Sequence, residues 1–147
     1  MKVDFSNVGD FEVIPAGHYL VTITDGELRT AGETAKHPGS EMILWTLTIM
    51  QGQYEGRKLF VNTTLLPHAL FSLKNLLKST GRWEEGDLSG DEFEFEIDDA
   101  LGAEVIAVVR IGTYQGEETN NVRRFRPVTE EALSQLGADR AGSDLLP

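Results

Sequence analysis

Residues 41–81 decide the fold, and they read EMILWTLTIMQGQYEGRKLFVNTTLLPHALFSLKNLLKSTG. Residues 41–50 and 57–66 are rich in β-branched and aromatic side chains and flank a glycine-containing turn, which predicts two strands joined as a hairpin. Pro67 then changes the period, because proline suits the first turn of a helix. Leucines recur at helical spacing until Gly81, which favours a stop, so an amphipathic helix is predicted from Pro67 onward.

Three more strands are predicted outside this stretch. Residues 18–24, 103–114 and 122–128 share the β-branched and aromatic composition that is typical of strands. Residues 29–40 are polar and contain glycine and proline, which predicts a loop, and residues 115–121 are interpreted as a turn. The predicted order is therefore three strands, one helix and two strands.

That order predicts a mainly β domain, a five-stranded OB-fold β-barrel with the amphipathic helix between strands 3 and 4. An open α+β sheet with one covering helix would give the same order. We favour the barrel because the strands are long and alternating and because closure removes exposed edges. The domain is expected to span residues 1–128, and residues 129–147 are expected to form a short helix, capped by Thr129 and ended by Gly137, followed by a flexible tail.

An acidic segment dominates the charge of the chain. The formal net charge is −11, but residues 84–104 contribute ten acids and no lysine or arginine, so the remainder is close to neutral at −1. Alternating apolar and acidic residues at 93–97 would also allow a short additional strand there. Mobile carboxylates in this segment could compete with a polyanion for a basic face, whereas the plainer interpretation is that they keep the protein soluble.

No motif in the sequence points to catalysis, a cofactor or a metal. The chain has no cysteine, and its three histidines (His18, His37 and His68) are scattered without a zinc-binding spacing. The acids at 91–99 could be imagined as a nuclease metal site, but a solvated acidic strand edge explains them better. No apolar run approaches the roughly 20 residues of a membrane span and no apolar leader is present, so a cytoplasmic location is expected.

Four short stretches follow one another in a distinctive order: VDFSN at 3–7, PAGHY at 15–19, QYEGRKLF at 53–60, and YQG followed by NV within 114–122. Over roughly residues 3–128 the chain resembles a family of tailed-phage proteins that was first described as a domain of unknown function. Its members sit in replication and recombination gene clusters and are regarded as single-stranded DNA-binding proteins with an OB-fold.

The resemblance implies sequence-tolerant binding of single-stranded DNA in the cytoplasm of a bacterial host, with no enzymatic activity. It also implies a phage recombinase, annealase or replication protein as partner, and homo-oligomers would be compatible with that role. Many single-strand-binding proteins recruit partners through a strongly acidic tip, but this chain ends in SDLLP, with one acid in five residues. Recruitment through the C-terminal tail is therefore not expected.

Binding of a single strand needs cations that follow the phosphates and flat side chains that stack on the bases. An OB-fold would place both on strands 2 and 3 and on the loops joining strands 1–2 and 4–5. The basic candidates are Arg29 and Lys36 in the first loop, Arg57 and Lys58 at the third strand, and Arg123, Arg124 and Arg126 on the last strand. The aromatic candidates are Trp45, Tyr54, Phe60, Tyr114 and Phe125.

Alternatives remain open for several of these residues. Trp45 alternates with other apolar residues and could be core, and Phe125 could be core with Arg123, on its own face, at the rim. Gly-x-Tyr-x-Gly occurs at 52–56 and 112–116, where hairpin chemistry explains it without a ligand. A virion accessory module, or an OB-type module that binds a protein or an oligosaccharide, would fit the same pattern.

Overall fold

The computed structural model describes residues 1–2, 13–90 and 93–138. The strands are β1 (Gly17–Thr30), β2 (Glu41–Ile49), β3 (Lys58–Thr64), β4 (Glu104–Tyr114), β5 (Glu117–Arg126) and β6 (Gly137–Ala138). The helices are α1 (Phe71–Ser79) and α2 (Glu130–Ser134), with single 3₁₀ turns at Pro67–Ala69 and Ile97–Asp99. The mainly β class and the helix between the third and fourth strands are thereby confirmed.

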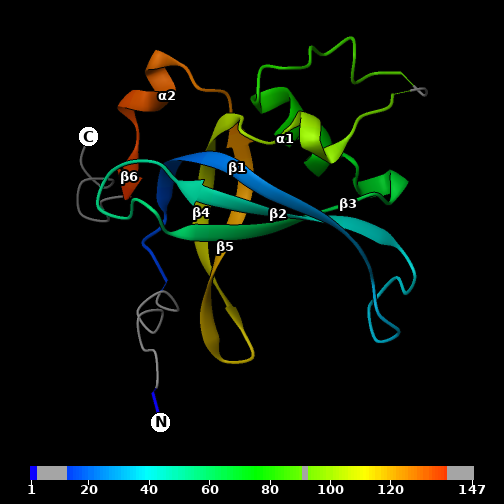
Figure 1. The fold of residues 1–147 in the computed structure, drawn as a ribbon, viewed down its shortest axis with the longest axis horizontal. Coiled ribbons are helices and arrows are strands. Elements are labelled where there is room, and N and C mark those ends of the chain that lie inside the picture. Colours follow the sequence, from blue (N-terminus) through cyan, green and yellow to red (C-terminus); the bar gives the residue numbers. More distant parts are fainter. Residues whose placement is uncertain (3–12, 91–92, 139–147) are drawn as a thin grey trace, which may run out of the picture.

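All six described strands form one antiparallel sheet in the order β3-β2-β1-β4-β5, with β6 paired to β1 (Figure 1). β1 pairs with three strands: its first half pairs with β4, its first two residues also pair with β6, and its second half pairs with β2. A register shift between Ile23 and Asp25 interrupts the pairing with β2. In Figure 1 the β4–β5 hairpin crosses the direction of β2 and β3 steeply as a result.

The expected closed barrel is not formed, because the sheet is open and has six strands rather than five. β3 and β5 lie close to each other but do not pair. Instead, Asn75 of α1 bonds the main chain of Phe125 on β5. Its Nδ2 donates to the Phe125 carbonyl at 3.1 Å, and its Oδ1 accepts from the Phe125 N–H at 2.7 Å. One carboxamide thus satisfies the two groups that a closing strand would have paired.

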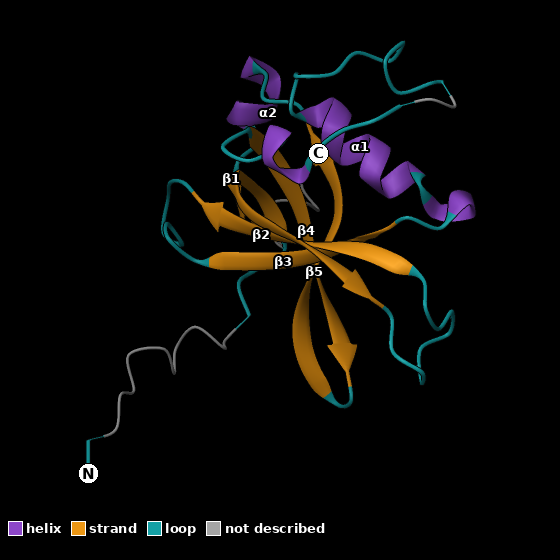
Figure 2. Cartoon of the chain, turned by 45° about the vertical axis from the view of Figure 1, so that its right-hand side comes forward, coloured by secondary structure: helices purple, strands orange, loops and turns teal. Residues whose placement is uncertain are grey.

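The main core lies between the sheet and α1, which covers one end of it (Figure 2). The helix buries its leucines at positions 73, 76 and 77, whereas Leu70, predicted to share their face, precedes the helix and is exposed. The inward residues of the strands include Ile23, Trp45, Leu47, Leu59, Val105 and Val109. Trp45 is fully buried and donates its indole N–H to the Thr63 hydroxyl at 2.8 Å.

The C-terminal elements dock on β1 and β5. Thr129 caps α2 as predicted, since its hydroxyl accepts from the Ala132 N–H at 3.1 Å. Arg126 donates to the Gln135 side-chain oxygen at 2.6 Å, just beyond α2. β6 then pairs with the start of β1, where a Cβ on Gly17 would clash with the carbonyl of Gly137. Except for Ala138, the expected flexible tail lies outside the described residues.

Three local predictions are corrected by long-range pairing. β1 continues to Thr30, so the loop begins at 31 rather than 29, because β2 extends alongside it. The turn predicted at 115–121 contains only Gln115 and Gly116, both at positive φ as a tight hairpin turn requires, and β5 starts at 117. Residues 93–97 form no strand, because their alternating burial comes from packing on the core without a partner strand.

Replacing Asn75 with alanine should lower the free energy of unfolding by about 1–3 kcal/mol, because two main-chain groups of a buried residue lose their partners. Urea unfolding followed by circular dichroism measures the loss. The matched control is Asn62→Ala on β3, since Asn62 is exposed and its side chain has no hydrogen bond to any described residue. Equal stabilities of the two variants would show that Asn75 does not hold the edge of β5.

Candidate nucleic-acid interface

A groove of about 210 Å³ follows the gap between β3 and β5 and reaches the start of α1. We call it the seam groove and define it by Asn62 of β3, Phe71 of α1, and Arg123 and Arg124 of β5, which all line it. It exists because the two edge strands approach each other without pairing. The open sheet therefore brings one strand of each edge and a helix terminus to a common surface.

A β-bulge explains why two successive arginines both face solvent. Val108 of β4 pairs with Arg124, but Val109 pairs with Val122, so Arg123 is left without a partner residue. Strand alternation predicted Arg123 on the same face as Phe125, whereas Arg123 is exposed and Phe125 is buried. Neither the Arg123 nor the Arg124 side chain forms a hydrogen bond or ion pair with a described residue, so both guanidinium groups are available to an anion.

The outer face of β3 matches the alternation in the sequence. Leu59 and Thr63 are buried, and Lys58, Phe60 and Asn62 are exposed. Phe60 is 56% exposed, so its ring is accessible to a ligand. The exposed aromatic and lysine predicted for this strand therefore stand on one accessible surface beside the seam groove.

The adjoining face of β1 is acidic. Asp25 and Glu27 lie across from Thr46 and Leu44 of β2, in the cross-strand rows that continue to β3. Arg29, predicted in a loop, lies in β1, and its guanidinium donates to the Glu27 carboxylate at 3.1 Å. An anion bound on the sheet would consequently be repelled on the β1 side and attracted on the β5 side.

The remaining basic candidates are dispersed. Lys36 is exposed in the loop between β1 and β2, and Arg57 directly precedes β3. Arg126 is half-buried, and its guanidinium lies 3.3 Å from His18 Nδ1 in addition to bonding Gln135. Arg126 therefore holds the C-terminal elements rather than the seam groove.

The aromatic candidates divide into accessible and inaccessible ones. Trp45 and Phe125 are buried in the core, so neither can stack on a base in this structure. Tyr54 sits in the β2–β3 turn with its ring edge-on to Tyr19 at 6.2 Å. Tyr114 is 68% exposed beside the β4–β5 turn. Six residues of strand separate that turn from Arg123, a distance of about 20 Å, and Figure 2 places the turn opposite α1.

Sequence reasoning missed Phe71, the most exposed aromatic side chain at the seam groove, with 72% of its surface accessible. Phe71 falls within the predicted helix and was not considered as a binding residue, because a phenylalanine within a leucine-rich segment usually belongs to the core. Its position one residue after Leu70, off the stripe of buried leucines, was the available signal.

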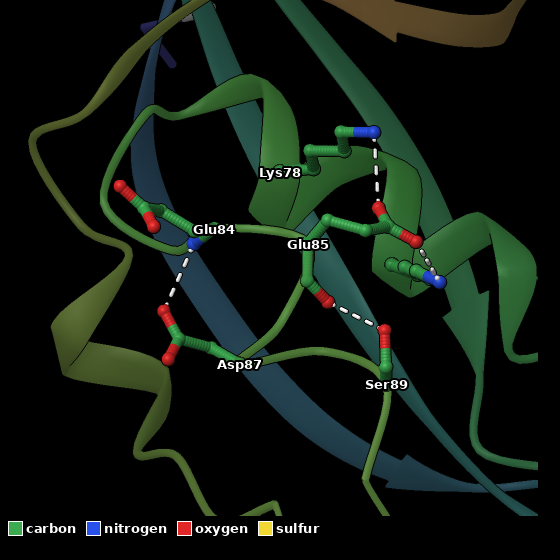
Figure 3. A network of polar contacts seen from close by, with 6 residues as sticks. Lys78, Glu84, Glu85, Asp87 and Ser89 are labelled. Atoms are coloured by element: carbon green, nitrogen blue, oxygen red, sulfur yellow. Dashed lines mark hydrogen bonds and ion pairs between the residues drawn. The ribbon is translucent and has the colours of Figure 1, made fainter.

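The acidic segment is folded onto α1 at its start. Glu85 bridges two helix lysines, with one carboxylate oxygen 2.7 Å from Lys74 Nζ and the other 3.0 Å from Lys78 Nζ (Figure 3). The hydrogen bonds from Lys74 and then Lys78 hold the pKa of the Glu85 carboxyl below its ordinary value. Because all three side chains are exposed, this network contributes little stability. Competition between the segment and DNA stays a prediction.

Two of the scattered histidines meet across the fold. His37 and His68 lie edge-to-face with ring centroids 5.6 Å apart. Within the described parts of the chain, no three His, Asp or Glu side chains gather in a way that could hold a metal ion. No described helix is long and apolar enough to span a membrane.

Comparison with known proteins assigns the chain to a sequence family. It matches a family described as a protein of unknown function, DUF669, over residues 1–134. The chain belongs to the DUF669 family. That match covers every element from β1 to α2, including both sides of the seam groove. No curated protein matches the chain.

Glu85→Gln should destabilise this DUF669 protein slightly at neutral pH. A lowered folded-state pKa means that the ionised carboxylate stabilises the fold above the unfolded-state pKa and that this contribution disappears as the pH falls through the folded-state pKa. The difference between wild type and variant should therefore be present at pH 7 and disappear as the pH falls through the lowered folded-state pKa of Glu85. Thermal unfolding across this range measures it, with Glu84→Gln, which lacks an ion pair among the described residues, as the control. A difference that persisted in acid would contradict the ion-pair explanation.

Proposed function

We propose that this protein binds single-stranded DNA without sequence preference along the seam groove and the outer face of β3. The observation that carries the proposal is the pair of exposed arginines that the β5 bulge presents at the seam groove. The lining of this groove includes the exposed Phe71 and, on β3, Asn62, which lies two residues from the exposed Phe60. Arginine bonds phosphate bidentately and stacks on bases, and exposed rings accept any base on their faces.

The magnitudes are sufficient for a functional affinity. Stacking of one base on an aromatic side chain is worth about 1–3 kcal/mol. Two such platforms with phosphate contacts from Arg123, Arg124 and Lys58 could reach micromolar affinity, which corresponds to about −8 kcal/mol. Proteins bound side by side on a strand would coat it at that affinity.

The distribution of charge supports a path along β3 and β5 rather than across β1. Asp25 and Glu27 repel phosphates on the β1 side, and Glu27 already engages Arg29. The stacking platforms require unpaired bases, because the bases of a duplex have no free faces. We therefore expect discrimination against double-stranded DNA.

Strand connectivity supports a further proposal about the fold. A central β1 paired to β2 and β4, with β3 and β5 as neighbouring edges and a helix between β3 and β4, is the arrangement expected of an OB-fold. We infer an OB-fold variant in which the last pairing is left open. Together with the resemblance to phage proteins noted above, this favours a role in phage DNA replication or recombination in the bacterial cytoplasm.

Titration into labelled oligo-dT of about 30 nucleotides tests the proposal, with a duplex of equal length as control. We expect binding of the single strand only, weakening as salt rises. Each phosphate contact contributes about −0.7 to the slope of log K against log salt. Replacing Arg123 and Arg124 with alanine should make the slope shallower by about 1.4.

The control for the double variant is Arg29→Ala, which removes a cation already paired to Glu27. No binding of oligo-dT by the wild type at low salt would refute the proposed function. Equal salt slopes for wild type and the Arg123/Arg124 variant would refute the proposed path.

Phe60→Ala should weaken single-strand binding about 5- to 150-fold, because one stacking platform is lost. Its stability should change by less than about 0.5 kcal/mol, since the ring is largely exposed. Tyr114→Ala is the matched control, because Tyr114 is also exposed but ends β4 beside the β4–β5 turn, which lies opposite α1 (Figure 2). If Tyr114→Ala weakens binding as much as Phe60→Ala, the strand must follow another face.

A further inference from the structure

A second groove, larger and more apolar, lies on the other side of Phe71. It has a volume of about 600 Å³ and runs between α1 and the segment that follows it. We call it the apolar groove and define it by Leu70, Phe71, Leu73, Leu77, Leu88 and Phe93, which line it. Its size lies within the range of about 300–1,000 Å³ that is typical of binding pockets.

The floor of the apolar groove is ordered by aromatic packing. Phe93 and Phe95 stack with ring centroids 5.8 Å apart and an interplanar angle of 8°. Trp83 sets its ring edge-on against both, at 6.4 and 6.3 Å. The rim remains uncovered, since Leu70 is 41% and Phe71 72% exposed. A contiguous apolar surface of this kind is typical of an interaction site.

The segment that forms one wall of the apolar groove is negatively charged, whereas the one charged residue in the lining itself is Lys74. Asp87, Glu94 and Glu96 are exposed on the segment that forms its wall. Among the described residues, Glu85 is the one acid of segment 84–104 that has an ion pair, and its partners are Lys74 and Lys78. The other exposed acids of this wall have no ion pair with a described residue, so a complementary occupant would be apolar on one face and basic beside it.

The lining also selects the secondary structure of the occupant. The residues that line the apolar groove come from α1, its two flanks and the acidic segment, and none belongs to a strand. Main-chain pairing with an extended peptide is thus not offered by this surface. A groove walled by side chains is instead the usual receptor for the apolar face of an amphipathic helix.

We propose that the apolar groove docks a basic amphipathic helix of a partner protein. Apolar side chains at helical spacing would bury against Leu70, Phe71 and Leu88, and lysines or arginines on the flanking positions would meet Glu94 and Glu96. The proposal does not depend on DNA binding, because it uses a different surface that shares only Phe71 with the seam groove.

The probe is a fluorescein-labelled peptide of leucine and lysine, about 18 residues or five turns long, patterned as an amphipathic helix. Two control peptides keep its length, one with glutamate in place of lysine and one with the leucines scrambled off the helical period. Anisotropy measures binding to the full chain. Trp83 fluorescence reports occupancy, since the second tryptophan, Trp45, is fully buried.

We expect the basic peptide to bind at least tenfold more tightly than either control and to change the Trp83 emission. Leu70→Lys should weaken it tenfold or more, because it places a charge in the groove. Leu133→Lys is the matched control, since Leu133 on α2 is 39% exposed and receives the same change elsewhere. Glu94→Gln with Glu96→Gln should weaken binding most at low salt, and Glu130→Gln with Glu131→Gln on α2 should not.

Equal binding of the basic and acidic peptides, or no binding below about 100 μM, would overturn the proposal. Equal weakening by Leu70→Lys and Leu133→Lys would do the same. If Leu70→Lys is unfolded by circular dichroism, the two charge variants decide the question alone. Unchanged peptide binding by the Arg123/Arg124 variant is expected, so failure of the DNA proposal and failure of this one are distinguishable.

Discussion

The carboxamide of Asn75 is the contact on which the open edge of the sheet depends. An edge strand must satisfy its main-chain groups with another strand, a side chain or water. Here one asparagine supplies a donor and an acceptor to Phe125, so β5 is satisfied at this point without β3. The Asn120 carboxamide binds the main chain of Ile14 in the same way. Its Oδ1 accepts from the Ile14 N–H at 2.9 Å, and its Nδ2 donates to the Ile14 carbonyl at 2.8 Å. The sheet can therefore remain open, and its opening becomes a groove.

The bulge at Arg123 matters because it places two arginines at the groove between β3 and β5 and so makes that groove basic. Regular alternation would have directed Arg123 inward with Phe125, where an unpaired guanidinium would be costly to bury. Inserting one residue opposite Val108 and Val109 lets Arg123 and Arg124 both reach solvent while Phe125 stays in the core. The open edge and the bulge are thus separate devices that act on the same surface, one providing the space and the other the charge.

Local sequence patterns were sufficient to predict most of the strands and helices, but they did not predict whether the sheet closes into a barrel. The period of two at 41–50 identified β2, and the leucine spacing after Pro67 identified α1. Alternation along β3 correctly predicted that Phe60 is exposed. Three features depend on residues that are far apart in the chain: the lack of pairing between β3 and β5, the position of the bulge in β5, and the pairing of Gly137 with β1. The alternation of apolar and polar residues within one segment does not determine such long-range contacts. The site was predicted in part for the same reason: Arg123 and Arg124 were found by composition, whereas Phe71 was hidden by an apolar helix pattern.

The strongly negative net charge is compatible with a DNA ligand because the charges are segregated. α1 stands between the two grooves, with the arginines of β5 on one side and the wall that carries Glu94 and Glu96 on the other. The start of that wall lies against α1, where Glu85 meets Lys74 and Lys78, rather than over the basic surface of β5. At about 10 Å, the Debye length in 0.1 M salt is shorter than the width of a helix with its neighbours, so each surface can attract a ligand of the opposite sign. Phe71, which borders both grooves, is the point where two such ligands would touch.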